Sequence, residues 1–223
     1  MKKYFKFLNQ KSIPKLFWSS ENTFTISPKP ISLFFLCFGL AIFGFGEAIL
    51  IAAGVGVSPW TVLAEGLTNY VNWSVGFATF IISVIVLLSW IPLRQTPGIG
   101  TILNAIIVAL VIDLSLPIIP DINNFFGKLL FIFFGVIITG IGGSVYLISN
   151  LGPGPRDGLM TGIQKKTGFP LAWVRSLIEI TAVILGWLLG GTFGIGTILF
   201  ALGIGPSYSL SIYTLNRVLN SKN

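Results

Sequence analysis

The 223-residue chain contains no histidine and a single cysteine, Cys37. Without histidine, Ser-His-Asp and Cys-His catalysis are excluded, and so are histidine-ligated metal sites. One cysteine cannot form a disulfide within the chain. An enzyme would have to use Asp157 or Glu47 as its base, and neither has a nucleophile beside it in the sequence. We therefore predict that the protein is not an enzyme and uses no metal or cofactor.

Charge is also scarce, because 9% of the residues are charged, whereas soluble domains carry about 25%. Hydrophobic residues make up 53% of the chain, and the mean hydropathy is +0.88. Such a chain cannot cover a water-soluble surface, so the lipid bilayer is its expected partner and solvent. The net charge of +7 does not indicate nucleic-acid binding, because six of the lysines stand within the first 29 residues.

Residues 1–30 form a basic segment with interleaved aromatic side chains, closed by Pro28 and Pro30. The segment is too polar for a signal peptide, whose apolar core directly follows a short basic region. We interpret it as a cytoplasmic tail, with adsorption to an anionic membrane surface as the alternative.

The rest of the chain repeats itself at an offset of 96 residues. The clearest match is the string Gly-Ile-Gly-Thr-Ile-Leu, which occurs at residues 98–103 and again at residues 194–199. The same offset pairs Gly39, Gly44, Gly46, Gly56 and Pro59 with Gly135, Gly140, Gly142, Gly152 and Pro155. We infer a duplication, with a first repeat at residues 31–120 and a second at residues 121–216.

Six apolar segments reach about the 20 residues that a bilayer requires. They are residues 31–53, 75–93, 98–116, 128–149, 169–189 and 194–213. Two further segments, residues 59–70 and 155–166, are too short to cross at about 1.5 Å per residue, and each follows a glycine-containing break. We predict an all-α polytopic membrane protein with six transmembrane helices and two short helices that are either interfacial or re-entrant.

The distribution of positive charge supports this topology. With the N-terminus in the cytoplasm, twelve lysines and arginines fall on the inner side and Lys128 falls on the outer side, as the positive-inside rule requires. The twelve are Lys2, Lys3, Lys6, Lys11, Lys15, Lys29, Arg94, Arg156, Lys165, Lys166, Arg217 and Lys222. Three spans per repeat imply that the second repeat enters from the opposite side, so the repeats have inverted topology. We expect a plasma-membrane protein with both termini cytoplasmic, including a C-terminal tail at residues 217–223.

Several motifs resemble those of a bacterial membrane protein family. They are residues 151–162 with the string Gly-Pro-Arg-Asp-Gly, Trp90-Ile91-Pro92-Leu93-Arg94, residues 97–104 and residues 193–197. Together they resemble the YczE-like branch of the YczE/YyaS/YitT family, from Ile31 to Ser209. The resemblance implies a multi-pass plasma-membrane protein of a group loosely associated with transport, and it carries over no site residue.

Ionisable side chains within membrane spans are expensive, so each is a candidate functional residue. Arg175 and Glu179 stand four residues apart on one helix, where they either pair structurally or serve the solute. Glu47 has no partner in its own helix. It is a coupling-proton site, a partner of Arg175 across the bundle, or a residue near the outer interface.

The break at residues 150–159 allows two arrangements. In one, Asp157 caps a short helix that lies at the cytoplasmic interface. In the other, the loop and helix enter the bundle, and free N–H groups near Gly154 and Arg156 face an anionic substrate, with residues 56–60 entering from the other side. The candidate substrate-binding residues are Gly56, Pro59, Gly154, Pro155, Arg156, Asp157, Glu47, Arg175 and Glu179.

Inverted repeats, paired helix breaks and buried charges favour a transporter or channel-like facilitator of a small anionic or other ionic solute, with its path at the interface of the repeats. The alternative is a non-transporting accessory protein that binds a protein partner or lipid through the basic, aromatic tail.

Overall fold

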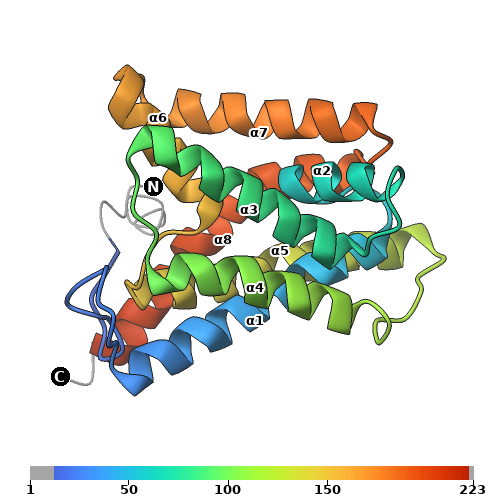
Figure 1. Ribbon diagram of the computed structural model, residues 1–223. Coiled ribbons are helices and arrows are strands. Elements are labelled where there is room, and N and C mark those ends of the chain that lie inside the picture. The colour runs from blue at the N-terminus through green and yellow to red at the C-terminus, as the bar shows by residue number, and fades with distance from the viewer. Residues whose placement is uncertain (1–12, 221–223) are drawn as a thin grey trace, which may run out of the picture.

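The structure is a computed structural model that describes residues 13–220, so the predictions for residues 1–12 and 221–223 lie outside the described residues. Within residues 13–220 the chain forms eight helices and no strand (Figure 1). The helices are α1 (Pro30–Ala53), α2 (Pro59–Thr68), α3 (Val75–Leu93), α4 (Ile99–Ser115), α5 (Phe125–Ile148), α6 (Pro155–Thr167), α7 (Leu171–Leu188) and α8 (Ile195–Asn220). The all-α architecture is therefore as predicted.

Local sequence explains where several helices begin and end. α1, α2 and α6 begin with Pro30, Pro59 and Pro155 at the first helical position, where a missing N–H breaks no helical hydrogen bond. α3 begins after Ser74, whose side chain accepts a hydrogen bond from the first turn. α1 ends at Gly54, which adopts a left-handed conformation with φ of 63°.

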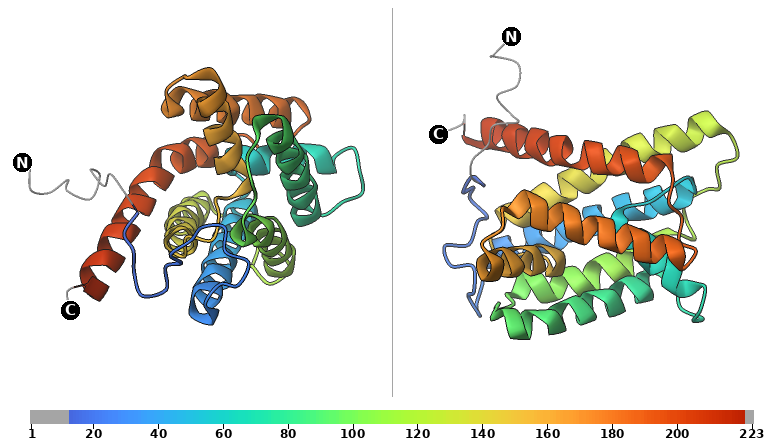
Figure 2. Two further views of the ribbon diagram at one scale, coloured as in Figure 1. Left: turned by 60° about the vertical axis from the view of Figure 1, so that its left-hand side comes forward. Right: turned by 90° about the horizontal axis from the view of Figure 1, so that it is seen from above.

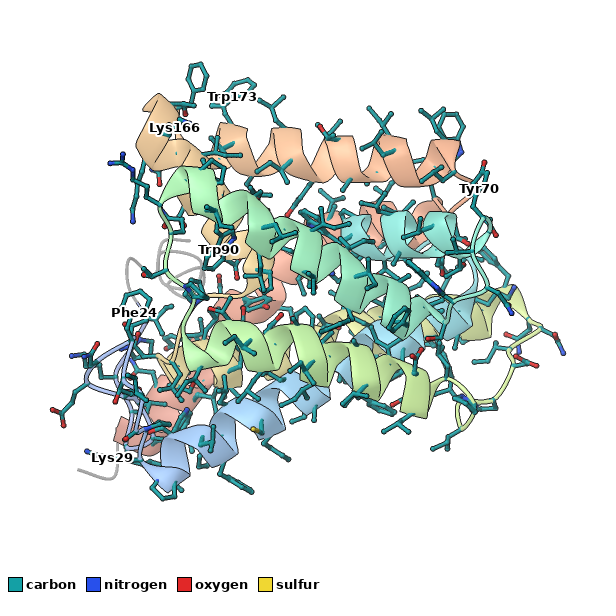
Figure 3. All side chains as sticks on the ribbon, in the orientation of Figure 1. Phe24, Lys29, Tyr70, Trp90, Lys166 and Trp173 are labelled. Carbon is teal, nitrogen blue, oxygen red and sulfur yellow. The ribbon has the colours of Figure 1, made fainter. Side chains whose placement is uncertain are left out.

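The long helices run side by side, and their connections lie at two opposite ends of the bundle (Figures 1 and 2). Lys29 and Lys166 lie at one end, which we call the tail end, and Tyr70 lies at the other, the far end (Figure 3). The short helices α2 and α6 both pack against α3 and α7. α2 lies toward the far end and α6 toward the tail end, so together they occupy the length of one long helix (Figure 1).

Five helices of the described chain are long and apolar enough to cross a membrane: α1, α3, α5, α7 and α8. α4 is apolar but has 17 residues, which places it just below that length. The sixth predicted span is therefore a shorter helix than the other five.

α8 is longer than the sequence suggested. The predicted span ended at residue 213 and was followed by a tail from residue 217, but the helix continues to Asn220. Arg217 lies in its last turn, where a cation interacts favourably with the helix dipole. Leu215 and Leu219 pack against the buried cluster formed by the N-terminal segment. These contacts keep the last turns helical, so residues 217–220 are part of the bundle.

α1 and α5 come into close backbone contact at two pairs of glycines. A Cβ added to Gly39 would lie 2.8 Å from the carbonyl oxygen of Gly142, and one added to Gly135 would lie 3.2 Å from that of Gly46. Small residues of this kind let helices approach closely in lipid. Gly39 and Gly135 are 96 positions apart, as are Gly46 and Gly142. The contact of Gly39 with Gly142 therefore corresponds, at this offset, to the contact of Gly135 with Gly46.

The break in each half of the chain is held by the last helix of the other half. The N–H of Gly100, at the start of α4, donates to the carbonyl oxygen of Leu151 at 2.7 Å. The N–H of Gly196, at the start of α8, donates to the carbonyl oxygen of Val55 at 2.9 Å. The offset of 96 residues again exchanges these two hydrogen bonds, because it pairs Gly100 with Gly196 and Val55 with Leu151.

Residues 13–29 pack on the tail end of the bundle, which the sequence did not predict. Trp18 is 1% exposed, stacks on Phe35 of α1 with ring centres 4.4 Å apart, and donates from Nε1 to the carbonyl oxygen of Val145. The N–H of Ser20 donates to the carbonyl oxygen of Ser149 at 2.9 Å. The described part of the tail is thus docked onto the helices that it precedes.

Replacing Trp18 by alanine is expected to release residues 13–29 from the bundle. Loss of a fully buried tryptophan costs about 3–5 kcal/mol, and Leu16 is the other buried large apolar side chain of this segment. Limited trypsin digestion in detergent should show faster cleavage after Lys15. Phe24→Ala is the matched control, because Phe24 is 52% exposed. Equal cleavage rates for the Trp18 variant and the parent protein would contradict the prediction.

Candidate functional site

A cavity of about 370 Å³ lies inside the bundle and is lined by residues from all eight helices. This volume falls within the range of about 300–1,000 Å³ that is typical of small-ligand sites. The first residues of α2 and α6 both contribute to its wall. The two short helices therefore point their N-termini toward one common space.

Two glycines with positive φ return the chain toward this space. Gly56 has φ of 115° and Gly152 has φ of 121°, conformations that other residues rarely adopt. After each turn a helix begins with proline, and the two N-termini approach until the Arg156 guanidinium carbon lies 5.2 Å from the centre of the Trp60 ring. This geometry corresponds to the second predicted arrangement of residues 155–166, in which the N-terminus of α6 enters the bundle.

Arg156 is the central side chain of this site. It lines the cavity and lies over the Trp60 ring, a cation–π contact. Within residues 13–220 its guanidinium has no hydrogen-bond or ion-pair partner. A guanidinium carries five N–H donors in a planar fork that matches a carboxylate or phosphate. Arg156 is therefore a cation with unused donors, facing a cavity.

Glu47 lies behind the start of α2 and is 1% exposed. Its Oε2 accepts hydrogen bonds from Ser58 Oγ at 2.7 Å and from Thr61 Oγ1 at 2.8 Å. Its Oε1 is buried and has no hydrogen-bond partner in the described chain. The predicted alternative of an ion pair with Arg175 is wrong, because the side chain instead packs against the N-terminus of α2.

Asp157 occupies the corresponding place at the start of α6. Its Oδ2 accepts a hydrogen bond from the Tyr146 hydroxyl at 3.1 Å and lies beside the backbone of Gly154. Asp157 also lines the cavity next to Arg156. Each short helix therefore has a carboxylate close to its N-terminus, where the helix dipole favours negative charge.

Arg175 and Glu179 form the expected pair on α7, with Arg175 Nε 2.9 Å from Glu179 Oε1. Both side chains line the cavity, with 54% and 27% of their surface exposed. The opposite charges of the two side chains therefore cancel each other at the edge of the cavity.

The structure brings most of the candidate residues together. Those that line the cavity are Pro59, Gly154, Pro155, Arg156, Asp157, Arg175 and Glu179. Gly56 lies outside it, where its backbone contacts Gly194 and Thr197 at the start of α8. Tyr146 and Asn104 also line the cavity and were not among the predicted residues. Their polar side chains within apolar segments of the sequence could have identified them as candidates.

The two halves contribute unequally to the cavity. The second half supplies four charged side chains, and the offset of 96 residues places neutral residues opposite them. The pairs are Arg156 with Trp60, Asp157 with Thr61, Arg175 with Thr79 and Glu179 with Ser83. Residues 13–220 contain no group of three or more side chains suited to hold a metal ion. The chemistry that this arrangement offers is the binding of an oxygen-bearing anion by Arg156.

The family of unknown function DUF6198 matches residues 31–212 of the chain. An uncharacterised protein of Haemophilus influenzae is 40% identical over 193 residues, which cover 86% of this chain and 88% of that protein. The uncharacterised membrane protein YczE of Bacillus subtilis is 34% identical over 184 residues, 82% of this chain and 86% of YczE. The uncharacterised protein YyaS of the same organism is 29% identical over 165 residues, 72% of this chain and 82% of YyaS.

No solved structure matches the chain. The resemblance to the YczE-like branch that the sequence motifs indicated is confirmed, and apolar helices together with the relationship to YczE identify a membrane protein. Because the match spans residues 31–212 and the relatives align over most of their own length, the chain belongs to the DUF6198 family of YczE-like membrane proteins.

Proposed function

We propose that the protein is a transporter or channel-like facilitator of the bacterial plasma membrane that carries a small anionic solute through the central cavity. The observation that carries this proposal is the Arg156 guanidinium, which has unused donors where the N-termini of α2 and α6 meet. Discontinuous helices that present their N-termini to an anion near the membrane midplane are a recurring plan in transporters.

In this proposal the chain has six spans, and α2 and α6 form two re-entrant halves of a seventh crossing. α4, with 17 residues, extends about 25 Å, which fits the lower range for a transmembrane helix. The two repeats are inverted relative to each other. Support comes from the contacts that exchange under the offset: Gly39–Gly142 with Gly46–Gly135, and Gly100–Leu151 with Val55–Gly196.

The tail end is the cytoplasmic side in this proposal. Lys29 and Lys166 lie there (Figure 3), as does the end of α8 with Arg217. Lys128 stands in the first turns of α5, at the far end (Figure 1). Cytoplasmic loops carry the excess of lysine and arginine in membrane proteins, which supports the proposal that both termini are cytoplasmic.

An anion is the solute best suited to the cavity. A cation such as Arg156 is expensive within a membrane unless a partner compensates it. The Asp157 carboxylate lines the cavity beside it and the Glu47 carboxylate lies behind the start of α2, yet neither forms an ion pair with it. The guanidinium fork is therefore left free for a carboxylate or phosphate group, which it binds with two parallel hydrogen bonds.

Reconstituted protein should carry an anion, and Arg156→Gln should reduce its uptake to the level of protein-free liposomes. Glutamine keeps much of the side-chain length but removes the charge and the fork of donors. The measurement is uptake of radiolabelled chloride, phosphate and L-lactate into proteoliposomes. Arg217→Gln is the matched control, because Arg217 is exposed in the last turn of α8. Full uptake by the Arg156 variant would exclude the proposed site.

A non-transporting accessory role is the second candidate. The observation that favours it is the exposed apolar surface of the docked segment, where Phe17 is 64%, Phe24 52% and Ile26 91% exposed beside Lys15 and Lys29. Such a surface suits a protein partner or anionic lipid. Folded wild-type protein that carries none of the three anions, and that loses its cellular function on deletion of residues 1–27 with membrane insertion intact, would favour this role.

A further inference from the structure

We infer that Glu47 binds a proton when the anion binds Arg156, so that the protein carries an anion and a proton together. This inference rests on the proposed transport function and adds the coupling ion to it. It is carried by two observations at the same place. The Arg156 guanidinium faces the cavity without a partner, and Glu47 Oε1 is buried without a partner.

The charges around the cavity require such a compensation. Arg156, Asp157, Arg175 and Glu179 line the cavity, and Glu47 lies behind its wall, bonded to Ser58. Two arginines and three carboxylates give a formal net charge of −1. A bound monovalent anion would change this formal charge to −2. Like charges close together disfavour ionisation of the nearest carboxyl group. A proton on one carboxyl group restores the original net charge.

Of these three carboxyl groups, Glu47 is the one with a buried oxygen that has no hydrogen-bond partner in the described chain. Asp157 is held by the Tyr146 hydroxyl, and Glu179 is paired with Arg175 and partly exposed. Glu47 has no cation within ion-pair distance among residues 13–220. Its Oε2 already accepts both hydroxyl hydrogen bonds, so Oε1 can carry the proton without breaking either bond.

Two ionisable side chains from other helices face Glu47. Arg156 of α6 and Tyr208 of α8 line the same cavity as Ser58, whose hydroxyl donates to Glu47 Oε2. At the start of α2, Glu47 is faced by the Ser58 and Thr61 hydroxyls, which are neutral. Arg156 is therefore the one cation among these side chains around Glu47 in residues 13–220.

Binding of an anion at Arg156 offsets the charge of this cation. A carboxylate or other anion on the guanidinium neutralises its charge, and Glu47 then takes up a proton more readily. The reverse follows by thermodynamic reciprocity, because a proton on Glu47 frees Arg156 to bind the anion more tightly. One transport step therefore moves one monovalent anion and one proton in the same direction, and no net charge crosses the membrane.

The test uses full-length protein in liposomes that contain a trapped pH-sensitive dye, with chloride, phosphate and L-lactate each supplied outside. An inward proton gradient should drive accumulation of the transported anion, about tenfold per pH unit at equilibrium, with acidification of the lumen. Glu47→Gln, which mimics the protonated carboxyl group, should still exchange labelled anion across the membrane. It should lose the accumulation and the acidification. Glu21→Gln is the matched control, because the Glu21 side chain is 87% exposed.

The possible outcomes are distinct. Wild-type uptake that is insensitive to the proton gradient would overturn the inference and leave the transport function standing. No uptake of any of the three anions by folded wild-type protein would overturn both. If Glu47→Gln does not fold, the wild-type ratio of protons to anions decides, because a ratio of one supports the inference and a ratio of zero excludes it. Retained accumulation in a folded Glu47→Gln variant would likewise exclude Glu47.

Discussion

Gly142→Ala is expected to destabilise the protein by about 3 kcal/mol or more and to yield little folded protein after extraction in mild detergent. The added Cβ would lie 2.6 Å from the carbonyl oxygen of Gly39 and would overlap the backbone nitrogen of Phe43. Because both neighbours are backbone atoms of α1, no side-chain rotation relieves the overlap, and α1 and α5 must separate. The measurement is the thermal unfolding of purified protein in detergent.

Gly205→Ala provides the matched control for this prediction. Gly205 lies in α8, and a Cβ built there meets no atom within 4 Å. Both substitutions add one methyl group inside a helix, and both gain about 1 kcal/mol of helix propensity. The difference between the two variants therefore measures the helix contact alone. Equal stability of the two variants would show that the close approach of α1 and α5 does not hold the fold.

Trp90→Ala is expected to destabilise the protein by about 3–5 kcal/mol and also to abolish anion uptake. Trp90 is 2% exposed within the bundle (Figure 3), and its Nε1 donates to the carbonyl oxygen of Pro155 at 3.0 Å. Its ring occupies the space that a Cβ on Gly158 would need. The side chain thus positions the first turn of α6, and Arg156 follows Pro155 directly.

Two further substitutions separate the contributions of Trp90. Trp173→Ala removes a tryptophan that is 68% exposed on α7 (Figure 3), so it should leave both stability and uptake unchanged. Trp90→Phe keeps an aromatic ring but removes the N–H donor, and it should cost about 0.5–1.5 kcal/mol because one hydrogen bond to the Pro155 carbonyl is lost. Thermal unfolding and uptake measured on the same preparations decide the case. Unchanged uptake in a folded Trp90→Ala variant would mean that Trp90 does not position Arg156.

Helix positions followed closely from the sequence. α3 spans Val75–Leu93 as predicted, and α1, α2 and α6 begin at or next to the predicted residues. Proline at the first helical position and glycine after the last are local signals, because they act on the backbone of the residue that carries them. The end of α8 was missed for the converse reason. Its last turns are stabilised by Leu215 and Leu219 packing on the N-terminal segment, a contact between opposite ends of the chain.

The candidate site was predicted in part. Arg175 and Glu179 could be paired from spacing alone, because the helical period brings positions four apart together. The hydrogen-bond partners of Glu47 could not be predicted from spacing, and the predicted alternatives did not include Ser58 and Thr61. Those hydroxyls reach Glu47 because the chain turns back after Gly56 and α2 starts beside α1. The direction of that return depends on the helices packed around it.

The sequence by itself determined that this chain lies in a membrane, that it is built of helices, that its motifs recur at an offset of 96 residues, and where the helices break. The reason is that hydrophobicity, charge and backbone preference belong to single residues and short segments. Only the tertiary structure decided that both breaks meet at one cavity and that Arg156 has no hydrogen-bond or ion-pair partner there within residues 13–220. It also decided that Trp18 is buried against the tail end of the bundle. These features depend on distances between helices, which close packing of many side chains sets together.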